Sequence, residues 1–158
     1  MFIAWESFLE ETFVLYLMGH RSAVGRSAVC YATPTSLQHA HSVLIGTQKF
    51  VDWANPEIVR KLAKIYFANG EPIDPVLGAI QSDLLDLKTV RNASAHLTST
   101  TGKSLDALAS RKLGRSCAKI TVSDFILSTD PNSSGGGSVL DSYTLVLDAG
   151  AENIANWR

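Results

Sequence analysis

The feature that most constrains this chain is the recurrence of apolar residues at helical spacing, beginning at the N-terminus. Within 2–18, the apolar stripe consists of Phe2, Trp5, Leu9, Phe13 and Tyr16. This spacing predicts an amphipathic helix that buries one face. Three glutamates interrupt the segment and no basic segment precedes it, so it has the pattern of neither a signal peptide nor a membrane-spanning helix. We therefore expect a soluble, cytoplasmic protein with no membrane partner.

Length and composition indicate one globular domain. The chain has 158 residues, of which 46% are hydrophobic and 18% charged, a balance that supports a buried core and is not typical of a disordered chain. Cys30 and Cys117 are the two cysteines, which are too few for a disulfide framework and fit a reducing compartment. We predict a single domain over residues 1–158.

Further helices follow from spacing and capping residues. A second is predicted over 36–53, although Gly46 weakens it, and a third begins at Pro56 with Asn55 as its cap and ends at Asn69 and Gly70. One long helix is expected from about residue 75 to about 98, followed by a shorter helix over 104–113.

The last part of the chain allows two interpretations. Residues 130–137 have the composition of a mobile, glycine-rich loop. Ser138 and Asp141 then have the spacing of a capping box and predict a C-terminal helix. A hairpin formed by 120–127 and 143–147, which are rich in β-branched and apolar residues, is the alternative. We expect an all-α helical bundle with short peripheral helices.

One motif carries chemistry, and it lies in the second half of the long predicted helix. It reads Arg91-Asn92-Ala93-Ser94-Ala95-His96. Five helical residues turn through about 500°, which places Arg91 and His96 roughly 140° apart around a straight helix. A single helix is therefore an awkward active site unless it bends or a second copy completes it.

Around this motif the chain resembles the HEPN domains, most closely the branch described as RiboL-PSP-HEPN. The resemblance covers most of the chain and rests on Ala4-Trp5-Glu6-Ser7-Phe8-Leu9-Glu10, Phe50-Val51-Asp52-Trp53, the motif with Val90 before it, and Ser123-Asp124-Phe125. It implies an all-helical fold that dimerises and cleaves RNA without a metal or cofactor. It also implies that His96 is the general acid/base, that Arg91 holds the scissile phosphate, and that Asn92 orients the arginine or contacts the phosphate.

The residue types suit those implied roles. Imidazole accepts and donates protons near neutral pH, and guanidinium offers a fixed fork of donors to phosphate oxygens. In one respect the chain departs from the family. Some HEPN toxins carry a tyrosine two residues after the histidine, which an antitoxin modifies, and this chain has Thr98 there.

Other candidate sites are weaker. The net charge is −1, so any RNA-binding surface is local, and Lys103, Arg111 and Arg115 are its candidates. Arg111, Arg115 and Lys119 form a basic stripe if their helix continues past Gly114. His39 and His41 lack nearby ligands for a metal site. Residues 101–104 copy the end of a P-loop, but no glycine stands at its first position, so we reject that interpretation.

These observations favour an RNA endonuclease that acts as a homodimer, in the role of a toxin or antiviral defence effector, with an antitoxin or a larger effector as a further partner. The alternative is a non-catalytic helical module that dimerises or binds RNA or nucleotide. A second alternative is an adaptor that uses exposed apolar surface to join a larger effector.

Overall fold

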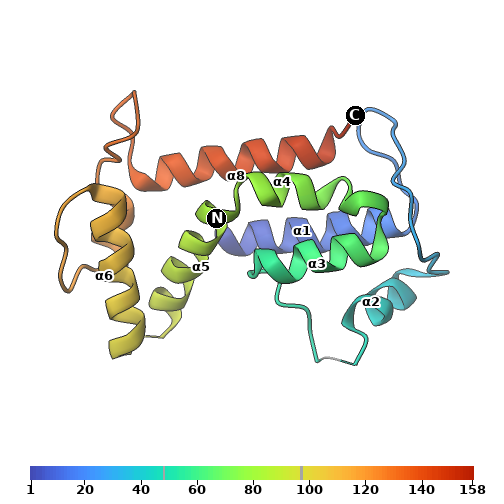
Figure 1. Ribbon diagram of the computed structural model, residues 1–158, viewed down its shortest axis with the longest axis horizontal. Coiled ribbons are helices and arrows are strands. Elements are labelled where there is room, and N and C mark those ends of the chain that lie inside the picture. The colour runs from blue at the N-terminus through green and yellow to red at the C-terminus, as the bar shows by residue number, and fades with distance from the viewer. Residues whose placement is uncertain (48, 97) are drawn as a thin grey trace. The chain divides into compact units, whose positions relative to one another are not determined.

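The structure is a computed structural model that describes residues 1–47, 49–96 and 98–158. Over these residues the regular structure is entirely helical, with eight α-helices and one short 3-10 helix (Figure 1). The predicted all-α class is confirmed. No helix within the described residues has both the length and the apolar character needed to cross a membrane.

The chain divides into two compact units. Unit 1 comprises residues 1–81 together with 148–158, and unit 2 comprises residues 82–147. Unit 1 is therefore discontinuous in sequence. The single domain expected from length stays a prediction.

Unit 1 is built around its first helix. Its helices are α1 (Phe2–Leu17), α2 (Leu37–Ile45), α3 (Pro56–Tyr66), η1 (Ala68–Gly70), α4 (Ile73–Ala79) and the last part of α8 (Val139–Ala155). Phe13 of α1 is fully buried, and its ring centroid lies 4.9 Å from that of Phe67 and 5.6 Å from that of Trp53. The predicted apolar stripe of α1 is buried in this core, which confirms the first helix.

The second predicted helix is too long. Helix α2 begins at its expected cap, where the Ser36 side chain accepts a hydrogen bond from the His39 amide, but it ends at Ile45. Gly46 has φ 56° and ψ −120°, which ends the helical path. The described residues between Gly46 and Pro56 contain no helix.

Helix α3 begins as predicted. The Asn55 side chain accepts a hydrogen bond from the Glu57 amide, and Pro56 occupies the first turn. The helix packs against α4 (Figure 1), where Arg60 Nε lies 2.6 Å from Asp74 Oδ1 and its Nη1 donates to Gln81 Oε1. Gly78 allows this approach, because a Cβ there would lie 3.2 Å from the Arg60 guanidinium.

The long helix predicted over about 75–98 is wrong, because two helices occupy this stretch. Helix α4 ends at Ala79, Ile80 has φ −111° and ψ 18°, and α5 runs over Gln81–Ala95. Gly78 weakens helical structure just before the break. Arg60 also binds Asp74 on one side of the break and Gln81 on the other.

Unit 2 contains most of α5, then α6 (Ser99–Leu113), α7 (Val122–Leu127) and the first part of α8. Helix α6 begins five residues before the predicted start at Ser104, because Thr98 and Thr101 form a reciprocal capping box. Residues 122–127 are helical, and α8 begins after Ser138 as expected. The C-terminal helix is confirmed over the alternative hairpin.

The glycine-rich segment between α7 and α8 is a closed turn with its own hydrogen bonds. The Asp130 amide donates to the Gly137 carbonyl at 2.9 Å, and the Gly137 amide donates to Ser133 Oγ at 3.0 Å. Asp130 is buried. These bonds give the described segment a defined conformation where composition alone predicted a mobile loop.

Candidate functional site

The Arg–His motif lies at the C-terminal end of α5. Arg91 is exposed, Asn92 is half-buried, and Ala93 packs into the core of unit 2. His96 is exposed and lies one residue beyond the end of the helix. The two groups proposed for catalysis are therefore both exposed to solvent. The alanine and serine residues between them in sequence have short side chains.

The backbone at His96 is fixed by the start of the next helix. The Thr101 hydroxyl donates to the His96 carbonyl, and the Thr98 amide donates to Thr101 Oγ1 at 3.0 Å. The Thr98 hydroxyl in turn accepts from the Thr101 amide. Thr98 thus serves as the cap of α6.

Within the described residues of one copy, Arg91 and His96 are both exposed. Arg91 belongs to α5, whereas His96 lies just beyond the end of that helix. Neither residue lines either of the two pockets found in unit 1. A closed site around this pair needs a second surface.

The three residues predicted to contact RNA differ in their position relative to α6 and in their contacts. Lys103 is exposed on α6, and Arg115 is exposed beyond it. Arg111 Nη2 lies 2.5 Å from Asp86 Oδ1, although the Arg111 side chain remains 61% exposed. The condition for a basic stripe on one helix is not met, because Gly114 adopts a left-handed conformation and ends α6 before Arg115.

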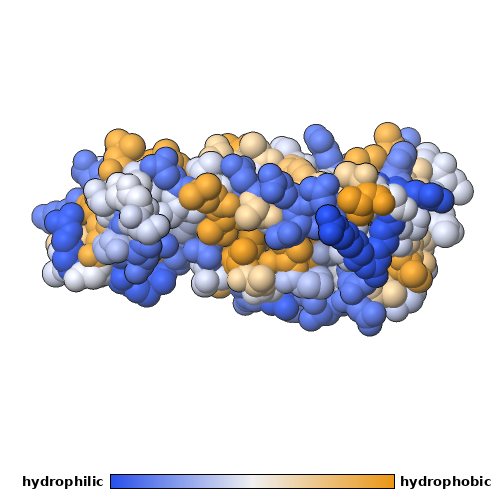
Figure 2. Space-filling model, turned by 90° about the horizontal axis from the view of Figure 1, so that it is seen from above, coloured by the Kyte–Doolittle hydropathy of each residue, from blue (hydrophilic) through white to orange (hydrophobic). Residues whose placement is uncertain are grey.

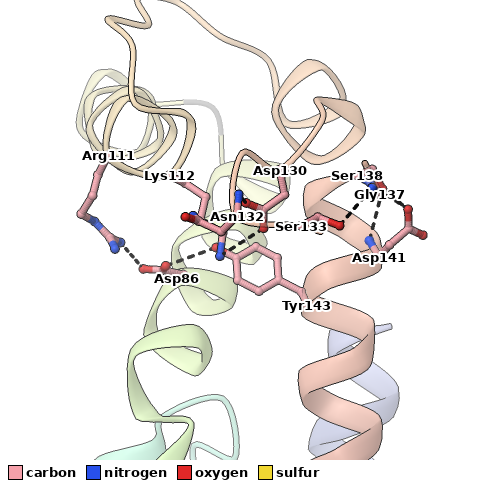
Figure 3. Close-up of polar contacts among 10 residues, drawn as sticks. All are labelled: Asp86, Arg111, Lys112, Asp130, Asn132, Ser133, Gly137, Ser138, Asp141 and Tyr143. Carbon is pink, nitrogen blue, oxygen red and sulfur yellow. Dashed lines mark hydrogen bonds and ion pairs between the residues drawn. The ribbon is translucent and has the colours of Figure 1, made fainter. Parts of the chain in front are cut away.

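Asp86 is the centre of a polar cluster in unit 2 that the sequence interpretation missed (Figure 3). It is buried on α5, where Arg111 binds one carboxylate oxygen and the Tyr143 hydroxyl donates to the other at 3.2 Å. Burial, together with the neighbouring Asp86 carboxylate, raises the pKa of Tyr143 well above its usual value. The cluster joins α5 to α6 and α8.

The second part of the cluster surrounds Asp130. Lys112 Nζ lies 3.5 Å from Asp130 Oδ2, and the Asn132 amide donates to Asp130 Oδ1 at 2.9 Å. Burial of Asp130 opposes its ionisation, but hydrogen bonds from Asn132 and Ser142 and the Lys112 charge outweigh it and lower its pKa. The Lys112 ammonium also lies 5.0 Å from the centroid of the Tyr143 ring.

The two histidines considered as metal ligands contact other side chains. His41 Nδ1 lies 3.6 Å from Glu10 Oε1, and His39 Nδ1 lies 3.3 Å from the Thr35 hydroxyl. The part of the chain that the structure describes contains no group of three potential metal ligands. Residues 101–104 are helical within α6, which is consistent with rejecting a P-loop.

Taken together, the fold and the motif define an all-helical protein with an arginine and a histidine exposed at the end of one helix. No family model, curated protein or solved structure matches this chain. The resemblance to HEPN domains therefore stays an interpretation of the sequence.

Proposed function

We propose that this chain is a metal-independent RNA endonuclease of HEPN type that acts in the cytoplasm as a homodimer. The observation that carries the proposal is the exposure of both Arg91 and His96 at the end of α5, with the backbone of His96 fixed by α6. A large polymeric substrate needs such accessible groups, and a deep pocket is not required for it.

The proposed reaction uses the 2′-hydroxyl of RNA as the nucleophile. His96 removes its proton, the oxygen attacks the adjacent phosphorus, and the bond to the 5′-oxygen breaks. A protonated imidazole supplies a proton to that leaving oxygen, which gives a 2′,3′-cyclic phosphate and a 5′-hydroxyl. Arg91 stabilises the charge on the phosphate oxygens, and Asn92 orients the arginine or contacts the phosphate.

A two-fold dimer supports this chemistry better than one copy does. One imidazole cannot accept and donate a proton at the same moment, whereas two α5 helices facing each other supply two histidines. The second copy also provides the surface that one copy lacks around the motif. The family resemblance adds the role of a toxin or defence effector, restrained by an antitoxin or housed in a larger effector.

The test is cleavage of single-stranded RNA in EDTA by the wild type, Arg91→Ala and His96→Ala. We expect at least a hundredfold loss of rate in each variant, since each removes a group that acts in the transition state. His39→Ala and Lys61→Ala are the controls, because they remove an imidazole and a positive charge from exposed positions of unit 1, outside the motif.

Equal cleavage by His96→Ala would overturn the proposal, and so would the absence of cleavage across varied RNAs. RNA binding without cleavage would favour the non-catalytic module. Light scattering coupled to size exclusion tests the dimer, and a fully active monomer would contradict it.

A further inference from the structure

Unit 1 contains a hollow that the proposed ribonuclease does not use. Its volume is about 270 Å3, and it lies between α1 and the turn that follows that helix. Thr12, Leu15 and Tyr16 line it from α1, residues 20–23 line it from the turn, and Ala155 closes it from the end of α8.

The turn that forms one wall is held in place from several sides. The Ser22 amide donates to the Arg26 carbonyl at 2.8 Å, and the Arg26 amide donates back to Ser22 Oγ at 3.1 Å. The Ala23 amide binds the Ala155 carbonyl at 2.8 Å, and the Arg26 guanidinium stacks 3.9 Å from the centre of the Trp157 ring. The wall is therefore formed before any ligand arrives, which lowers the entropic cost of binding.

The hollow is rich in hydrogen-bond donors and contains no acid among its lining residues. Ser22 is 6% exposed, and within the described chain its hydroxyl accepts the Arg26 amide while its own proton has no acceptor. His20 and Arg21 both line the hollow, and neither has a carboxylate partner among the described residues. Arg26, unlike Arg21, has a carboxylate partner, because Glu71 Oε2 lies 3.5 Å from Arg26 Nη2.

The rest of the lining is apolar. Leu15 and Ala155 offer carbon surface, whereas Tyr16 is buried and its hydroxyl is already bound to the Ile154 carbonyl at 2.7 Å. Seen from above, strongly hydrophilic and apolar residues lie next to each other near the C-terminal end of α8 (Figure 2). Ligand sites commonly combine an apolar wall with a few convergent polar groups.

We propose that this hollow binds a small organic oxyanion, with the carboxylate or phosphate against Arg21, His20 and Ser22 and an apolar or aromatic body against Leu15 and Ala155. The volume suits a ligand up to about the size of a mononucleotide. The proposal does not depend on the ribonuclease activity, because no residue that lines the hollow belongs to the Arg–His motif.

Calorimetric titration of the intact chain with uridine 5′-monophosphate, uridine, benzoate and inorganic phosphate tests the proposal. We expect uridine monophosphate or benzoate to bind at least tenfold more tightly than uridine or phosphate, and the stronger of the two identifies the ligand class. Arg21→Gln should weaken that binding at least tenfold. Lys61→Gln removes the same charge from exposed α3 and should leave it unchanged.

Ala155→Leu fills the hollow while keeping a helix-forming residue, and it should abolish binding with an unchanged circular dichroism spectrum. Full binding by Ala155→Leu would overturn the proposal. The proposal would also be overturned if neither uridine monophosphate nor benzoate bound more tightly than uridine, and by binding of phosphate alone, which would indicate an adventitious ion only. Failure to bind any of the four probes also contradicts it, whatever the outcome of the cleavage assay.

Discussion

Asp130 is a buried carboxylate whose ionised form is held by Lys112, Asn132 and Ser142, and this arrangement makes the stability of unit 2 depend on pH. The pKa of Asp130 is lower in the folded chain than its unfolded value of about 3.9. The stabilisation is therefore fully present above about pH 4 and is lost as the pH falls through the folded pKa.

The matching prediction concerns Asp130→Asn. At pH 7 the variant should be less stable by about 1–3 kcal/mol, because Lys112 loses its partner and the amide cannot accept the same bonds. The difference between wild type and variant should shrink as the pH falls below about 4. Urea unfolding across this range measures it, with the exposed Asp148→Asn as control. A difference that is constant with pH would contradict the prediction.

The pKa of Tyr143 is shifted in the opposite direction to that of Asp130. Burial raises its pKa, so the folded chain holds the phenol protonated. The contribution of Tyr143 to folding stability is therefore present below the unfolded pKa of about 10. It is lost as the pH rises above that value. Tyr143→Phe removes the hydrogen bond from Tyr143 to Asp86, while the ion pair between Asp86 and Arg111 remains. The variant should be less stable than the wild type by about 1 kcal/mol at pH 7.

Above about pH 10 the Tyr143→Phe variant should lose less stability than the wild type, because it lacks a phenol that ionises on unfolding. Denaturant unfolding at pH 7 and pH 10.5 compares the two. Tyr31→Phe, which changes a tyrosine that is 66% exposed, is the control. A stability gap that widens at high pH would refute this assignment.

At the scale of helices, local signals in the sequence predicted where α1, α2, α3 and α8 begin. Asn55 with Pro56, and Ser138 with Asp141, are caps that act within a few residues, so they are readable without the fold. The break at Ile80 lies between Asp74 and Gln81, which bind Arg60 from 14 and 21 residues away in sequence, and periodicity does not report such contacts.

In the candidate site, too, the sequence indicated what lies within a short motif and missed the contacts between residues far apart in sequence. Arg91 and His96 belong to one short motif, so the sequence indicated them, and the structure shows that both are exposed. Asp86 lies within an apolar stripe, and its partners Arg111 and Tyr143 are 25 and 57 residues away. The hollow beside Ser22 likewise joins α1, a turn and the end of α8, and no local pattern predicts that meeting.

The capping box of α6 gives a prediction at this scale. Thr98→Ala removes the side chain that accepts the Thr101 amide, and it should destabilise the helix start by about 0.5–2 kcal/mol. Amide hydrogen exchange should accelerate at Thr101. Thr98→Ser should restore protection, and Thr100→Ala, an exposed change within α6, should leave it unchanged. Unaltered exchange in Thr98→Ala would show that the cap does not hold this turn.

At the scale of the whole chain, the sequence leaves unit 1 after residue 81 and returns to it at residue 148. Two helices cross these points: α5 begins with Gln81, and α8 gives its first nine residues to unit 2 and the rest to unit 1. A continuous helix is cooperative along its length, so unfolding of the first part of α8 in unit 2 should weaken the last part, which Tyr16 and Ala23 hold in unit 1.

The three tryptophans, Trp5, Trp53 and Trp157, all belong to unit 1, so their fluorescence reports on that unit alone. Phe125 is fully buried in unit 2, and Phe125→Ala should lower stability by about 3–5 kcal/mol. If residues 1–158 form one cooperative domain, as we predict, the variant shifts the urea midpoints of tryptophan fluorescence and of circular dichroism equally. The exposed Leu127→Ala, also in unit 2, is the control. A fluorescence midpoint that stays in place while helicity is lost earlier would show that the two units unfold independently, because the tryptophans would then remain in an intact unit 1.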